Sequence, residues 1–138
     1  MSSSIFEKTY LAVVSGHLKE NKGIINAPIS RKENSIIERE VSEKGQVAIT
    51  HYEVLQKFEN YSLVECSLET GRTHQIRVHM AYIGNHLLGD SLYGYNNQNL
   101  INRHALHSFK MKFIHPISKE KICLEAPIPK DIKKLISQ

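Results

Sequence analysis

The chain has no tryptophan, and its 138 residues contain only two cysteines and four prolines. It also lacks any apolar run near the roughly 20 residues that a membrane-spanning helix needs, so we expect no membrane association. Cys66 and Cys123 each stand in an apolar, strand-like run, which predicts two buried thiols rather than a disulfide. The first residues lack the charged and apolar regions of a signal peptide. These absences together predict a cytoplasmic protein.

The motifs of many cofactor-dependent and hydrolytic enzymes are also missing. There is no Gly-x-Gly-x-x-Gly, no P-loop and no serine nucleophile elbow. The eight histidines form no His-Glu-x-x-His signature, and no Cys-x-x-Cys pattern is present. We therefore expect neither a metal site nor a nucleotide cofactor. Aspartate is scarce as well, because Asp90 and Asp131 are the only two.

The net charge of +4 is unevenly distributed. Residues 102–138 hold eight Lys/Arg and three Asp/Glu, whereas residues 1–101 hold ten and eleven. A basic C-terminal surface would suit a polyanion such as RNA. Charge alone favours the simpler alternative of a solvated, lysine-rich surface.

The hydrophobic pattern predicts one α+β domain over residues 1–138. Alternating or β-branched runs predict strands over residues 8–15, 46–54, 61–68, 105–114 and 119–125. Helical spacing predicts helices over residues 73–83 and 130–137. Between these elements we expect a loose, polar excursion over residues 17–45, with a short extended piece at Ile24 and Ile25, and a Gly- and Asn-rich loop over residues 86–103. Several strands with few helices predict a mixed, mainly antiparallel sheet.

The most informative segment is residues 70–80, TGRTHQIRVHM, which contains two arginines, two histidines and an amide. In a helix, Arg77 follows Thr73 by about one turn. A guanidinium held at the edge of a sheet is well placed to pair with a carboxylate or a phosphate. The sequence shows no obvious carboxylate to receive it.

This segment closely resembles the arginine motif of the RluA-like pseudouridine synthases. Residues 8–16 (KTYLAVVSG) resemble the tyrosine motif of that family, and residues 45–54 resemble the strand after its variable excursion. The resemblance continues, in the family's order, through residues 89–94, 103–108, 115–116 and 126–129. It implies the fold of a pseudouridine synthase catalytic domain and no cofactor.

The resemblance departs at the N-terminus. Family members carry an upstream His-Arg-Leu-Asp segment whose aspartate is the nucleophile, but the seven residues before Lys8 include no aspartate. We therefore expect the C-terminal part of a catalytic domain, without the small RNA-binding domain that often precedes it, and inactive by itself. Asp90 matches a loop of the family where the acid looks structural, so we do not expect it to replace the nucleophile.

The resemblance also implies roles for individual residues. Arg77 would hold the catalytic aspartate ionised, and the ring of Tyr10 would stack on the flipped base while its hydroxyl assists proton transfer. The expected RNA-binding residues are Lys8, Arg72, His74 and Gln75. The structural alternatives are an Arg77 that ties the helix to the sheet, a Tyr10 in the core and a His74 with a structural partner.

The sequence thus predicts an RNA pseudouridine synthase that acts on ribosomal RNA or tRNA. Two alternatives remain open. One is a binding module that holds RNA through Arg72, Arg77 and the C-terminal lysines without isomerising it. The other is a self-associating remnant, because a partial domain leaves strand edges that favour a second copy or the missing N-terminal half.

Overall fold

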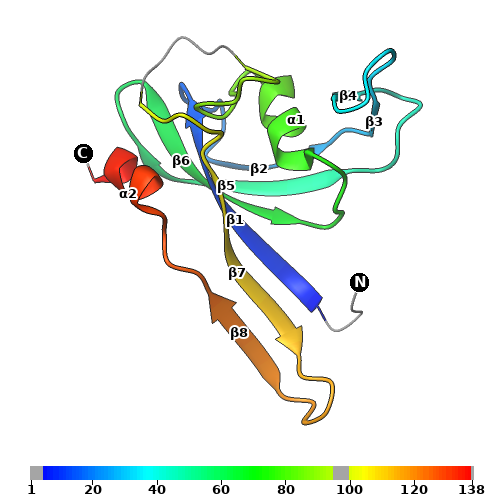
Figure 1. Ribbon diagram of the computed structural model, residues 1–138, viewed down its shortest axis with the longest axis vertical. Helices are drawn as coiled ribbons and strands as arrows, with labels where there is room; N and C mark the ends of the chain where they lie inside the picture. Colours follow the sequence, from blue (N-terminus) through cyan, green and yellow to red (C-terminus); the bar gives the residue numbers. More distant parts are fainter. Residues whose placement is uncertain (1–4, 95–99, 138) are drawn as a thin grey trace.

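A six-stranded antiparallel sheet organises the molecule (Figure 1). The computed structural model describes residues 5–94 and 100–137. The strand order is β2-β5-β6-β1-β7-β8, and each neighbouring pair is antiparallel. The strands are β1 (Ile5–Ser15), β2 (Lys22–Asn26), β5 (Ile49–Lys57), β6 (Tyr61–Leu68), β7 (Leu106–Ile114) and β8 (Lys121–Glu125), and the helices are α1 (Gln75–Tyr82) and α2 (Lys130–Ile136). The predicted α+β class is confirmed.

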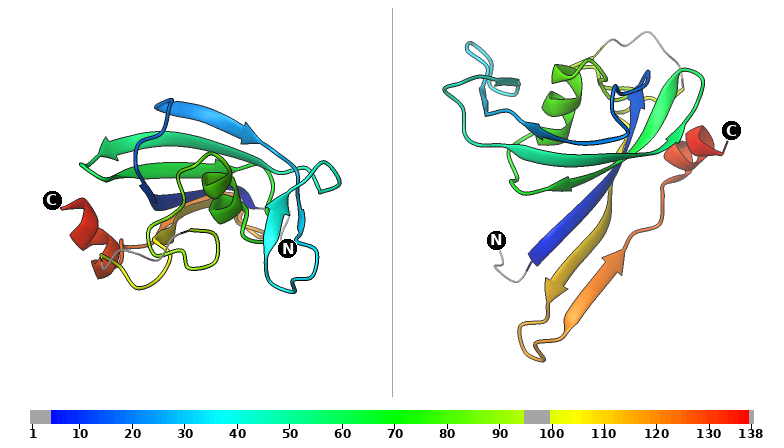
Figure 2. Two further views of the ribbon diagram at one scale, coloured as in Figure 1. Left: turned by 90° about the horizontal axis from the view of Figure 1, so that it is seen from above. Right: turned by 180° about the vertical axis from the view of Figure 1, so that it is seen from behind.

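Strand β1 lies inside the sheet, and its second half, over residues 11–14, is buried on both faces. Its most buried apolar residues, all at most 3% exposed, are Leu11, Ala12, Val13 and Val14. Successive side chains of a strand point to opposite faces. Ala12 and Val14 therefore pack with α1, and Leu11 and Val13 pack with α2. Figure 2 shows the strong twist of the sheet, with β5 and β6 crossing the line of β1 and β7.

The excursion over residues 17–45 is more ordered than the sequence predicted. It contributes β2, which pairs with β5, and a separate two-stranded hairpin of β3 (Ile29–Arg31) and β4 (Arg39–Val41). Ile29 packs with Ala48 and Val78 of α1, which fixes the hairpin beside the helix. The polar composition hid these strands because their short, one-sided apolar pattern has too few residues to reveal a period.

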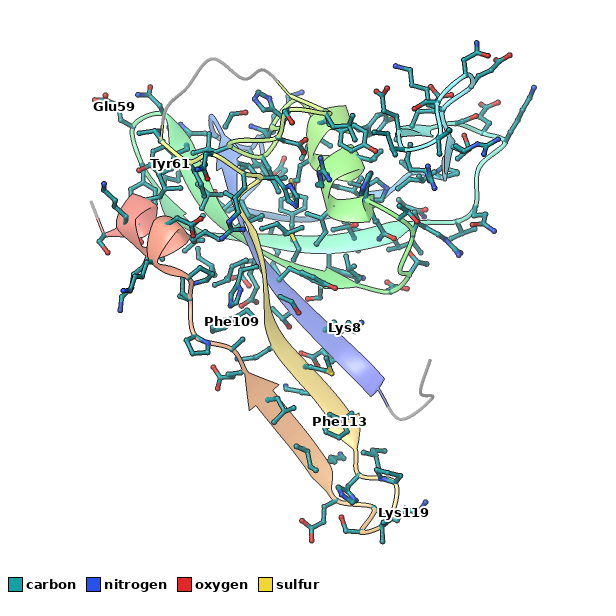
Figure 3. All side chains as sticks on the ribbon, in the orientation of Figure 1. Lys8, Glu59, Tyr61, Phe109, Phe113 and Lys119 are labelled. Atoms are coloured by element: carbon teal, nitrogen blue, oxygen red, sulfur yellow. The ribbon has the colours of Figure 1, made fainter. Side chains whose placement is uncertain are left out.

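Strands β7 and β8 and the first part of β1 extend from the body as an arm (Figure 1). Lys8, Phe113 and Lys119 lie along this arm (Figure 3). The prediction that Cys123 is buried is wrong, since this residue is exposed on β8, which is an edge strand. Its neighbour Leu124 is also 55% exposed. Cys66 is buried in β6 as predicted.

The helix boundaries differ from the prediction mainly at the start of α1. His74 has a φ of 57°, which is left-handed backbone, so the helix begins at Gln75 rather than at Thr73. The C-terminal helix and the strand over residues 61–68 agree closely with the sequence pattern. The described part of the predicted loop over residues 86–103 forms no helix or strand, and residues 95–99 lie outside the described residues.

Among the described residues, no helix has the length and apolar character needed to cross a bilayer.

Candidate active site

A cavity of about 380 Å³ lies where the start of α1 meets β1, β6 and the segment leading into β7. It brings together most of the residues that the sequence singled out. The lining residues are Tyr10, Leu68, Arg72, His74, Gln75, Ile76, Arg77, His104 and Leu106. Tyr10 belongs to the face of β1 that α1 covers, so its ring joins the cavity from the sheet while Arg77 joins it from the helix.

Arg77 has a carboxylate partner that the sequence analysis missed. Its Nε donates to one oxygen of Asp90 at 3.0 Å, and its Nη2 donates to the other at 2.9 Å. The Arg77 side chain is 12% exposed and that of Asp90 is fully buried. The sequence showed no obvious carboxylate to receive Arg77, and the structure shows that Asp90 does so. Sequence did not reveal the pair because the loop after α1 returns the acid to the helix.

The loop backbone fixes Asp90 in place. Gly89 has a φ of 74°, and a Cβ at this position would lie only 2.0 Å from the carbonyl oxygen of Arg103, so glycine is required. One carboxylate oxygen of Asp90 also accepts hydrogen bonds from the backbone N–H groups of Leu92 and Tyr93. Burial by itself would raise the pKa of the Asp90 carboxyl, but the bonds from Arg77 and the two amides outweigh it and hold the pKa below its ordinary value.

Tyr93 connects three parts of the site. Its ring lies 5.1 Å from the guanidinium carbon of Arg77, within the range of a cation–π contact. Its hydroxyl oxygen accepts the backbone N–H of Arg39 in β4 and lies 2.6 Å from Nδ1 of His74. The sequence analysis gave Tyr93 no role, although it belongs to the segment 89–94 that resembles the family's loop.

His74 lies at the edge of the cavity and contacts the hydroxyl of Tyr93. Burial lowers its pKa, and the nearby guanidinium groups of Arg77 and Arg39 lower it further, which favours the neutral imidazole. In the neutral tautomer that carries its proton on Nε2, Nδ1 accepts a hydrogen bond from the Tyr93 hydroxyl. This contact fits the structural alternative for His74, and its role in RNA binding stays a prediction.

Gln75 differs from its predicted role. Its amide oxygen accepts from the hydroxyl of Thr70 at 2.7 Å and from the backbone N–H of Arg72 at 3.0 Å. Its amide nitrogen donates to the carbonyl of Ile49 at 3.0 Å and to the hydroxyl of Thr50 at 2.9 Å. All four hydrogen-bonding positions of the side chain are used, and the residue is 2% exposed. Gln75 therefore joins the turn before α1 to β5 and has no group left for RNA.

The other two predicted RNA-binding residues remain accessible. Arg72 lines the cavity, with its Nε anchored at 2.6 Å on the carbonyl oxygen of Val47. Lys8 does not line the cavity, because it lies further out on β1, where β1 runs along the arm (Figure 3). One polar residue of the cavity had no predicted site role: His104, just before β7, whose pKa is lowered by burial and then by Arg77.

Within residues 5–94 and 100–137, no three His, Cys, Asp or Glu side chains come together as a candidate metal site. The cationic and aromatic side chains that line the cavity are those of Arg72, Arg77, Tyr10, His74 and His104.

Comparison with known proteins identifies the family of the chain. Residues 2–82 match the family described as RNA pseudouridylate synthase. The chain belongs to this family. The synthase match covers the tyrosine strand, the excursion and the arginine helix, and so includes Tyr10, Arg72 and Arg77.

Individual synthases agree with that assignment along nearly the whole chain. The uncharacterized RNA pseudouridine synthase YhcT of Bacillus subtilis is 48% identical over 98% of this chain and 45% of its own length. Ribosomal large subunit pseudouridine synthase D of Xanthomonas campestris is 39% identical over 99% of this chain and 45% of its own. The chain spans about half the length of these curated relatives.

A solved synthase structure has the same fold. Human RNA pseudouridylate synthase domain containing 1 aligns with a TM-score of 0.76 and 28% identity, over 88% of this chain and 54% of that one. The similarity to the RluA-like pseudouridine synthases that the sequence motifs indicated is thereby confirmed.

Proposed function

We propose that this chain forms the arginine- and tyrosine-bearing part of an RNA pseudouridine synthase site that acts on uridine in ribosomal RNA or tRNA. The observation that carries the proposal is the convergence of Tyr10 and Arg77 on one cavity in a chain of this family. The reaction is an isomerisation: the C1′–N1 bond breaks, the C1′–C5 bond forms, C5 loses a proton and N1 gains one. No cofactor is needed for this balance.

The contacts of Arg77 support a role toward a second acid. Asp90 takes its Nε and Nη2, and Nη1 has no hydrogen-bond partner in the part of the chain that the structure describes. Asp90 and the ring of Tyr93 therefore fix the guanidinium, while Nη1 remains for an aspartate supplied from outside these 138 residues. A cation beside that aspartate would keep it ionised for attack.

Tyr10 is suited to the base. A flipped uracil needs a flat apolar surface and a polar group at its edge, and a phenol offers both. The cavity volume of about 380 Å³ is in the range of small-ligand sites. We assign Tyr10 to stacking and to the proton transfer between C5 and solvent.

A chimera tests this function. This chain would replace the aligned segment of Bacillus subtilis YhcT, and pseudouridine in ribosomal RNA and tRNA would be measured by nucleoside mass spectrometry. We expect the chimera to form pseudouridine and the variants Arg77→Gln and Tyr10→Leu to lose at least about 100-fold in rate. Lys57→Gln, at an exposed position on β5, is the matched control. Full activity of a folded Arg77→Gln chimera would contradict the assignment.

The 138-residue chain by itself should form no pseudouridine. Its two aspartates are both paired with arginine: Asp90 with Arg77, and Asp131 with Arg103. Asp90 is also fully buried and accepts four hydrogen bonds, and neither aspartate lines the cavity that contains Tyr10, so neither is placed to attack a uridine there. Pseudouridine made by the purified chain would overturn this expectation.

The arm supports a second candidate, a non-catalytic RNA-binding or self-associating role. Strand β8 is an edge of the sheet, and Leu124 and Ile117 on the arm are 55% and 86% exposed. Such an edge favours pairing with another copy or with the rest of a catalytic domain. Analytical ultracentrifugation without RNA, between about 5 and 200 µM protein, tests self-association. A dimer should become a larger fraction of the protein as the concentration rises.

A further inference from the structure

A second hollow lies on the other side of Arg72, between that residue and the β3–β4 hairpin. It has a volume of about 440 Å³. Four cations line it, namely Arg31, Arg39, Lys44 and Arg72, and we call it the hairpin groove. Arg72 lines both the hairpin groove and the cavity that contains Tyr10 and Arg77, so the two hollows share a wall.

Among the charged side chains of the hairpin segment, only positive ones line the groove. Residues 28–46 contain four Lys/Arg and four Glu. Three of the four cations line the hairpin groove, and none of the four glutamates does. The remaining cation, Lys32, pairs with Glu38 at 3.6 Å instead. A chain segment of zero net charge thus presents a strongly positive face to the groove.

The register of the hairpin places two of these cations against each other. Arg31 and Arg39 are directly paired across β3 and β4. Like charges in directly opposed positions destabilise a strand pair. Within the described residues, neither Arg31 nor Lys44 has a carboxylate partner to relieve the repulsion. An anion in the hairpin groove would turn this repulsion into attraction.

The groove is already formed by contacts within the protein. Ile29 and Gln46 exchange backbone hydrogen bonds, each 2.9 Å long, which close the excursion onto β3. Nη1 of Arg39 donates at 3.3 Å to backbone carbonyls of residues 36–38, and Nε of Arg72 is anchored on Val47. Two of the four guanidinium or ammonium groups are therefore held in place, which lowers the entropic cost of binding an anion.

We propose that the hairpin groove binds the phosphodiester backbone of the RNA next to the nucleotide that enters the cavity. The inference rests on the proposed function, because an RNA with a base beside Tyr10 must carry its neighbouring phosphates past Arg72. Guanidinium groups match phosphate oxygens with two parallel hydrogen bonds. Contacts of this kind position the strand and read no sequence.

Salt-dependent RNA binding of the 138-residue chain tests the groove. The variant Arg31→Gln/Lys44→Gln removes two exposed cations whose side chains make no hydrogen bond among the described residues, so the fold should persist, as a urea midpoint would check. The control Lys32→Gln/Lys57→Gln removes the same charge from two positions that do not line the hairpin groove. The probe is a fluorescently labelled RNA hairpin with a uridine-containing loop, measured by anisotropy from about 50 to 300 mM NaCl.

Loss of two single-strand phosphate contacts should reduce the slope of log Kobs against log salt by about 1.4 and weaken binding about tenfold at 100 mM salt. The control should leave the slope near that of the unmodified chain. Equal slope changes in both double variants would overturn the proposal, as would absence of RNA binding by the unmodified chain. Competition by poly-glutamate as effective as that by RNA of equal charge would overturn it too, in favour of an acidic protein partner.

The chimera separates this proposal from the proposed function. The groove proposal is contradicted, and the proposed function supported, if the chimera forms pseudouridine equally well with and without the groove substitutions and the salt slopes are unchanged. The proposed function is contradicted, and the groove proposal supported, if the folded chimera is inactive while the 138-residue chain shows the expected change in salt slope.

Discussion

The guanidinium of Arg77 donates two hydrogen bonds to the carboxylate of Asp90, and the Asp90 side chain is fully buried. The family resemblance implies that Arg77 pairs with the catalytic aspartate. The guanidinium of Arg77 is already oriented by Asp90, a second acid in the same chain. The pair is nearly neutral, so Asp90 reduces the field that Arg77 exerts on the cavity while fixing its direction. Orientation by a buried carboxylate is the structural condition for an arginine that must meet a substrate or an acid at one defined position.

Removing the buried carboxylate should destabilise the fold. Asp90→Asn leaves Arg77 as a largely buried, unpaired charge, and we expect the free energy of unfolding to fall by about 3–5 kcal/mol. Urea denaturation followed by circular dichroism measures it. The matched control is Asp131→Asn in the Arg103 pair, whose side chains are 39% and 38% exposed, where solvent limits the loss to about 1 kcal/mol. Equal losses at the two sites would contradict the buried-pair account.

Gln75 should be intolerant of apolar replacement. Gln75→Met keeps the length of the side chain but leaves the partners in β5 and in the turn before α1 without hydrogen bonds. Each unsatisfied buried group costs about 1–3 kcal/mol, so we expect a total loss of at least about 2 kcal/mol. Gln56→Met at an exposed position of β5 should stay within about 0.5 kcal/mol. A Gln75→Met protein as stable as this control would show that the four bonds contribute little.

His79 should make the stability of the protein depend on pH. It is fully buried, its Nε2 lies 2.8 Å from the carbonyl oxygen of Ala27, and its Nδ1 lies 2.8 Å from the hydroxyl of Thr50. Burial lowers its pKa from the ordinary 6.5, although the bond to Ala27 opposes this shift. The unfolded chain therefore binds a proton at a higher pH than the folded chain does. Its contribution to stability is complete above pH 6.5 and is lost as the pH falls toward the lower folded pKa.

Unfolding free energies between about pH 5 and 8 measure this contribution. Burial lowers the pKa of His74 and His104 as well, so the difference between the unmodified chain and His79→Gln isolates His79. The difference should vary with pH, whereas the exposed His17→Gln control should follow the unmodified chain. Parallel curves for all three proteins would exclude His79 as the source.

The two cysteines should react at very different rates. Burial raises the pKa of the Cys66 thiol to about 12, whereas Cys123 is exposed on β8. Because the thiolate is the reactive form, iodoacetamide at pH 8 should modify Cys123 in the folded chain and Cys66 only after unfolding. Peptide mass spectrometry assigns the sites, and Cys123→Ser should be unreactive until denaturant is added. Rapid native labelling of Cys66 would contradict the packing of β6 against α1.

Local patterns in the sequence were enough to predict much of the fold. The strand over residues 61–68 and the helix α2 follow from alternation and helical spacing, because each element buries one side of a regular period. The β3–β4 hairpin was missed because strands of three residues are too short to show a period. The thiol of Cys123 was misplaced because an apolar run in an edge strand looks the same as one in a covered strand.

The sequence by itself determined the family, the α+β class and the two residues, Tyr10 and Arg77, that meet at the cavity. It could do so because these depend on motifs and on the order of short elements along the chain. Only the tertiary structure decided that Asp90 receives Arg77, that Gln75 is saturated by protein partners and that Arg31 opposes Arg39. Those relations depend on where loops return in space and on strand register, and neither leaves a periodic trace in the sequence.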